Sequence, residues 1–172
     1  QYTVGAGENT ADLAVTGSGL HGATVKDAAG NDADLAGAVT NPTGTLNIDT
    51  LAPHLDSIVA SPTRGNPTAG GLIKFTLDFV ESVNLAGGAP TLSLNDGGTA
   101  VYDAAATVLL GDQSKLVFDY VVAAGDTPTH SLSVTGFTPH GATVDDLAGN
   151  LADLTHVSQT FAGLSVNEQG NV

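Results

Sequence analysis

The stretch Leu72-Ile73-Lys74-Phe75-Thr76-Leu77-Asp78-Phe79 alternates apolar and polar side chains from Ile73 onward. This period of two is typical of a β-strand that buries one face. Six other short runs have strand composition, and turn sequences such as Gly87-Gly88-Ala89-Pro90 separate the runs. These six runs cover residues 54–59, 91–94, 99–102, 115–121, 131–134 and 163–166. The pattern therefore predicts an all-β fold.

A long segment of the chain occurs twice. Residues 21–35 return as residues 140–154, 119 positions later and without a gap, and both segments begin His-Gly-Ala-Thr-Val. Such self-similarity indicates a repeat, here with a unit of about 118 residues. Seven short strands in one unit predict an immunoglobulin-like β-sandwich. We expect a C-terminal part of one repeat, then a complete repeat, then the start of the next linker: residues 1–48, 49–168 and 169–172.

The partial copy would supply only the last strands of such a sandwich, and two or three strands do not bury a core alone. Our hypothesis is that another chain, or another piece of polypeptide, completes it. The alternative is a half-domain that packs against its neighbour by chance. The sequence has no methionine and opens at Gln1 inside a strand-like stretch, which indicates a piece of a longer polypeptide.

The composition excludes several classes of function. The chain has 4 Lys plus Arg against 18 Asp plus Glu, a net charge of -14 and no cysteine. Four basic residues neutralise little of a nucleic-acid backbone, and no apolar run is long enough to span a bilayer. Without cysteine there is no disulfide and no thiolate nucleophile. We expect no enzyme, because no nucleophile and base pair stands out, and we interpret the five histidines as surface residues, with transition-metal binding as the alternative.

The densest polar constellation is the repeated loop, which carries four Asp or Asn residues around one glycine in each copy. Hard oxygen ligands in a tight turn are what calcium requires, and a divalent cation would relieve the repulsion among the carboxylates. The alternative is a solvated acidic turn whose side chains cap their own backbone. The candidate ligands are Asp27, Asn31, Asp32 and Asp34 in the first copy and Asp145, Asp146, Asn150 and Asp153 in the second.

A further acidic residue, Asp49, lies where the partial copy joins the complete one. The segment 47–53 reads Asn-Ile-Asp-Thr-Leu-Ala-Pro, and Pro53 stiffens the entry to the next strand. A metal bound by Asp49 would fix the angle between two repeats. The alternative is a plain proline-containing linker.

The segments 49–53, 75–83 and 90–95, together with the pattern D-x-A-G-N at 146–150, resemble the bacterial immunoglobulin-like repeats of giant secreted adhesins. The same pattern stands at 27–31 in the first copy. The resemblance implies an extracellular β-sandwich, tandem arrays, and calcium beside or between domains. It carries ligand roles to Asp27, Asn31, Asp49, Asp146 and Asn150. Val80 departs from the family, which often has serine before the glutamate.

These observations lead to one expected function and two alternatives. We expect a structural extender repeat of a bacterial cell-surface adhesin of the biofilm type, stiffened by calcium (Ca²⁺) at loops and domain joints. Its partners would be the neighbouring repeats of the same polypeptide, and it would act outside the cell. The first alternative is a subunit of a surface layer or surface filament that self-assembles through residues 1–48 by strand addition. The second is a sugar-binding module.

Overall fold

The computed structural model describes residues 1–39, 41 and 43–167, so the predicted linker start at 169–172 lies outside the described residues. Contacts divide the chain into two compact units, Gln1–Leu51 and Ala52–Val172. The predicted boundary, between residues 48 and 49, differs from this division by three residues.

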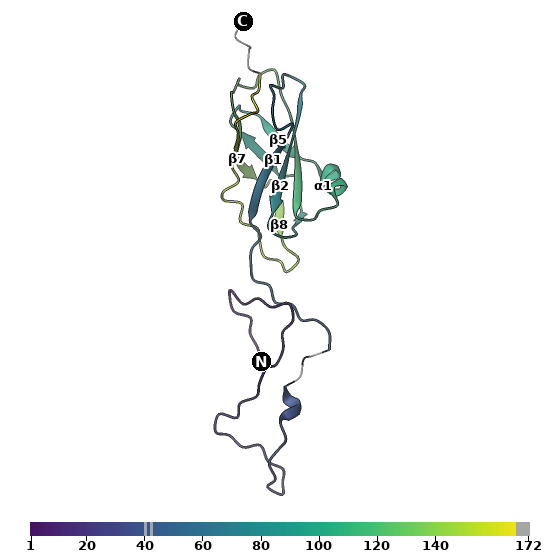
Figure 1. Ribbon diagram of the computed structural model, residues 1–172, viewed down its shortest axis with the longest axis vertical. Helices are drawn as coiled ribbons and strands as arrows, with labels where there is room; N and C mark the ends of the chain where they lie inside the picture. The colour runs from purple at the N-terminus through teal and green to yellow at the C-terminus, as the bar shows by residue number, and fades with distance from the viewer. Residues whose placement is uncertain (40, 42, 168–172) are drawn as a thin grey trace. The chain divides into compact units, whose positions relative to one another are not determined.

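The second unit is built from short antiparallel strands and one short helix (Figure 1). Seven strands form one sheet in the order β1-β2-β6-β5-β4-β7-β9, and β3 pairs with β8 separately. The prediction of an all-β fold is confirmed in this coarse sense. The elements are β1 (Leu55–Ser61), β2 (Leu72–Phe79), β3 (Asn84–Ala86), β4 (Thr91–Leu94), β5 (Thr99–Tyr102), α1 (Ala104–Leu110), β6 (Lys115–Val121), β7 (Leu132–Thr138), β8 (Thr143–Asp145) and β9 (Gln159–Phe161).

The core lies along the inner face of β2, as the alternation in the sequence predicts. Ile73, Phe75 and Leu77 are fully buried, and the intervening residues are not. On the neighbouring strand β6, Phe118 pairs with Phe75 in register. The sheet curls until the ring of Phe75 lies 5.4 Å, centroid to centroid, from the ring of Phe161 on β9, near the far edge. The strands therefore enclose one core within a curled sheet.

Several elements differ from the prediction. The expected strand at 163–166 forms only isolated bridges, through Leu164 and Val166. The sequence pattern did not indicate β3, β8, β9 or the helix α1. This helix forms because its ends are capped: the Asp103 carboxylate accepts a hydrogen bond from the Ala106 amide at 2.9 Å, and Gly111 ends the helix with a left-handed φ of 65°.

Gly98, in the turn before β5, leaves space that the Tyr120 ring fills. A Cβ atom at this position would lie 2.6 Å from the ring, which is 1% exposed and packed in the core. We expect Gly98→Ala to lower the free energy of unfolding by about 1–3 kcal/mol, as overpacking does. Gly136→Ala on β7 is the matched control, because no atom lies within 4 Å of the place that its methyl group would take. Equal midpoints for the two variants in urea unfolding would contradict this assignment.

The first unit contains no β-strand among its described residues. Its extended pairing is limited to the bridges Thr10–Ile48 and Lys26–Asp32, and a 3₁₀ turn covers Ala36–Ala38. Of the described side chains in this unit, only Ile48 is buried. The strands expected in the partial copy are therefore reduced to bridges, which agrees with the rule that two or three strands do not bury a core.

Candidate metal centre

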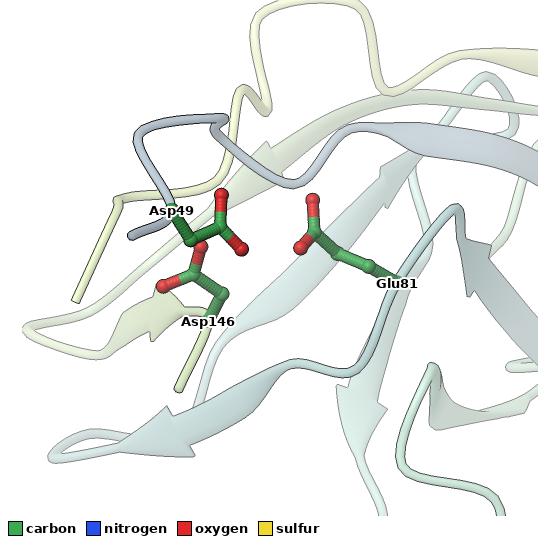
Figure 2. A group of neighbouring side chains, drawn as sticks. All are labelled: Asp49, Glu81 and Asp146. Carbon is green, nitrogen blue, oxygen red and sulfur yellow. The ribbon is translucent and has the colours of Figure 1, made fainter. Parts of the chain in front are cut away.

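Three carboxylates from distant parts of the sequence face one another in Figure 2. Asp49 lies in the segment that leads toward β1, Glu81 follows the end of β2, and Asp146 follows the end of β8. Each offers one oxygen, and these three oxygens all lie within 4.8 Å of one another. Asp146 is buried, and the other two are partly exposed. Among the described residues, this is the only group in which three His, Cys, Asp or Glu side chains gather so closely.

The Asp146 carboxylate accepts hydrogen bonds from the loop 146–150 in which it lies. One oxygen accepts hydrogen bonds from the backbone amides of Ala148 and Asn150, both at 2.8 Å. The other oxygen accepts from the Asn150 side-chain amide at 2.7 Å. Gly149 allows the turn because it adopts a φ of 90°, which favours glycine. The D-x-A-G-N pattern is therefore a self-capped turn, as the alternative reading of the acidic loop expects.

This environment keeps Asp146 ionised. Burial acts to raise the pKa of the Asp146 carboxyl, but the hydrogen bonds from Asn150 and the loop amides oppose it and hold the pKa below its ordinary value. A charged Asp146 therefore lies close to Asp49 and Glu81. Three carboxylates at this separation repel one another when all are ionised, and a divalent cation among them removes the repulsion.

The first copy repeats the turn. Asp27 accepts hydrogen bonds at 2.9 Å from the Ala29 amide, the Asn31 amide and the Asn31 side chain. These bonds, with the Asn31 side chain as the largest contribution, lower the pKa of Asp27. Asp32 forms an ion pair with Lys26, and the Asp34 carboxylate caps the amide of Ala36 at 2.9 Å. The predicted ligands of this loop are therefore engaged with their own chain.

The predicted ligands Asp145 and Asp153 accept hydrogen bonds from neighbouring side chains. Asp145 accepts from the Asn84 side chain at 3.2 Å, and Asp153 accepts from the Thr155 hydroxyl at 2.6 Å. Thr155 is the main cause of the lowered pKa of Asp153, with smaller contributions from His156 and His54. These two histidines and Asp153 line a groove of about 380 Å³, but their ligand atoms do not gather within 4.8 Å of one another.

Sequence reasoning foresaw two of the three residues that the fold brings together. Asp49 and Asp146 were candidates, whereas Glu81 was not. The available signal for Glu81 was its place two residues after the alternating stretch that ends at Phe79. Calcium ligation by the remaining candidates stays a prediction.

No protein-family model matches the chain, and no curated protein or solved structure is similar enough to count as a match. The resemblance to adhesin repeats therefore remains a prediction. Within the described residues, no helix is long and apolar enough to cross a membrane.

Proposed function

We propose that this chain is a structural extender segment of a bacterial cell-surface adhesin, built from immunoglobulin-like β-sandwich repeats and stiffened by calcium. The observation that carries the proposal is the cluster of Asp49, Glu81 and Asp146. Its task is mechanical: to add length and stiffness to an extracellular array in which neighbouring repeats are its partners. The proposal assigns no catalytic role to any residue.

The donor set of the cluster suits calcium. Calcium takes six to eight oxygen ligands in flexible geometry, and carboxylates, carbonyls and water all serve. Asp49, Glu81 and Asp146 supply three carboxylate groups, with the remaining positions left to carbonyls or water. Such an ion would tie the segment that leads toward β1 to the loops that follow β2 and β8. Because the ion would bind the folded state alone, it would stabilise that state by mass action.

The charge balance supports uptake of a cation. The chain carries 18 acidic residues, and its basic residues are too few to compensate them. All three lysines already form ion pairs: Lys26 with Asp32, Lys74 with Asp103 and Asp119, and Lys115 with Asp78 and Asp112. Uncompensated like charge destabilises a compact fold, and bound calcium reduces it.

The test is thermal unfolding of the chain in calcium and in excess chelator at fixed ionic strength. At a free calcium concentration of about 100 times Kd we expect a stabilisation of about 2.7 kcal/mol. For a domain of this size, that corresponds to a rise in Tm of about 10 °C. Magnesium at the same concentration should give a smaller rise, because it requires near-ideal octahedral geometry.

Glu81→Gln is the test variant, because it removes one carboxylate of the cluster and nearly preserves the side-chain shape. Asp56→Asn is its matched control, since it also removes one negative charge, on the exposed surface of β1. We expect Glu81→Gln to reduce the calcium-dependent rise in Tm by at least half, and Asp56→Asn to leave it unchanged. An identical Tm in calcium and in chelator for the original chain would refute the calcium part of the proposal.

A further inference from the structure

Apolar side chains in the first unit are exposed where their repeat equivalents in the second unit are buried. Five of them are between 47% and 54% exposed, and their equivalents are between 0% and 5% exposed. The pairs are Tyr2 and Tyr120, Val4 and Val122, Val15 and Val134, Val25 and Val144, and Leu46 and Leu164. We call these five first-unit side chains the open face.

Local hydrogen bonds show that these pairs are equivalent in structure as well as in sequence. The Tyr2 hydroxyl lies 2.7 Å from a Glu8 carboxylate oxygen, and the Tyr120 hydroxyl lies 2.6 Å from an Asp126 carboxylate oxygen. The Glu8 carboxylate also accepts a hydrogen bond from the Gly5 amide at 2.6 Å, and the Asp126 carboxylate accepts one from the Ala123 amide, also at 2.6 Å. The two chain segments thus take the same local course, although only one has a core.

A second set of bonds extends this equivalence to the end of the segment. In the first unit, Thr10 and Ile48 exchange two backbone hydrogen bonds, and Thr129 and Val166 do the same in the second. The D-x-A-G-N turns also share the same three hydrogen bonds, as described above. Because the backbone course agrees at both ends and in the middle, the second unit shows which neighbours the open face is shaped to receive.

Each equivalent position pairs with a residue between 52 and 119, and Val134 pairs in addition with Gln159 on β9. Tyr120 pairs with Ile73 on β2, and Val134 pairs with Leu94 on β4. Val144 pairs with Leu85 on β3. The amide of Val122 donates to the carbonyl of Gly71 at 2.9 Å. Leu164 forms a bridge with Gly65, so each side chain of the open face has an identified type of partner.

We propose that the open face is a docking surface for a set of β-strands with the chemistry of residues 52–118, joined to Gln1 as Phe118 is joined to Asp119. These strands would present an alternating apolar face, like that of β2, to the open face. Burial of five large apolar side chains would convert the bridges of the first unit into strands of a complete sheet. The inference does not depend on calcium, so it is tested in chelator.

A second intact copy of this chain does not fit as the occupant. Its own residues 52–119 already form its core: Ile73, Phe75, Leu77 and Leu92 are 0% exposed there. Lending them to another copy would expose the face that they now cover. If one copy lent these strands to another, the apolar area buried on the open face would be offset by the apolar area exposed in the lending copy. Strands that are not yet part of a core would bury the open face without such a loss.

The experiment is a fusion that places a second copy of residues 52–118 directly before the full chain, because Gln1 is the repeat equivalent of Asp119. We expect hydrogen exchange at the amides of Thr10, Leu13 and Ile48 to slow by at least about tenfold relative to the unfused chain. The control fusion carries Ile73→Asp and Leu94→Asp in the added copy only, and it should leave exchange unchanged. All samples contain chelator, so this outcome is separate from the calcium test.

Two results would overturn the proposal. In the first, the fusion leaves these three amides as fast as in the unfused chain, so that strands of this chemistry do not occupy the open face. In the second, the unfused chain dimerises in analytical ultracentrifugation, and the same amides become protected as its concentration rises. That result would make a second copy the occupant and would support assembly between chains.

Discussion

Replacing Tyr120 by alanine is expected to lower the free energy of unfolding of the second unit by about 3–5 kcal/mol, the cost of removing a large buried aromatic side chain. The Tyr120 ring is 1% exposed and belongs to the core. Its hydroxyl lies 2.6 Å from carboxylate oxygens of both Asp96 and Asp126. Asp96 is itself buried, so the variant also removes a hydrogen-bond partner from a buried carboxylate.

The repeat supplies a matched control for this variant. Tyr2 occupies the equivalent position in the first unit but is 54% exposed. We expect Tyr2→Ala to change the free energy of unfolding of the second unit by less than about 0.5 kcal/mol. Tyr120→Phe separates the contribution of the buried ring from that of the hydroxyl, because it keeps the ring and removes only the hydroxyl. We expect it to lower the free energy of unfolding by about 1–3 kcal/mol. Urea unfolding followed by circular dichroism measures all three variants. A cost for Tyr2→Ala equal to that for Tyr120→Ala would contradict the assignment of the core to the second unit.

The strands best predicted from the sequence are those whose residues alternate or form short apolar runs between turns. The bounds of β2, β4, β5 and β6 agree with the predicted runs. A buried strand that pairs with neighbours on both edges needs this pattern to place its apolar side chains on one face. The expected strand 54–59 has an observed counterpart, β1, displaced by one or two residues at its ends.

The elements that the sequence did not indicate owe their form to capping or to tertiary pairing. The run Ala104–Leu110 has no polar residue except Thr107, so no helical period distinguishes one face. It becomes a helix because Asp103 and Gly111 cap its ends. Strands β3 and β8, three residues each, exist only through their mutual register, Leu85 opposite Val144, and no local pattern indicates such a pairing.

The candidate site shows the same division. Asp49 and Asp146 stand out because each lies in a sequence motif. Glu81 gains its place from the fold, since Glu81 and Asp146 lie 65 positions apart in sequence and meet only through the packing of the loops after β2 and β8. The acidic loops were expected to gather four ligands each. In the structure, Asp27 and Asp146 also accept hydrogen bonds from the amides of their own turns, a short-range interaction that spacing alone does not reveal.

Asp146→Ala is expected to be the most damaging change within the cluster, because Asp146 has two tasks. The variant leaves the amides of Ala148 and Asn150 without their carboxylate acceptor, and hydrogen bonds to charged groups contribute about 1.5–3 kcal/mol. This loss should appear in chelator as well as in calcium. In calcium, the variant should lose the metal-dependent stabilisation in addition. Glu81→Gln keeps the Asp146 carboxylate that accepts from the turn amides, so comparing the two variants in both conditions separates the turn from the ion.

Acid titration checks the same assignment independently. Since the pKa of Asp146 is lower in the folded protein than its ordinary value, its ionised form is favoured in the folded state. Its contribution to stability is therefore fully present above the unfolded pKa of about 4 and is lost as the pH falls through the lower folded value. In chelator, the difference in free energy of unfolding between the original chain and Asp146→Ala should shrink as the pH falls below about 4. A difference that stayed constant down to about pH 2 would show that the carboxylate charge of Asp146 does not hold the turn.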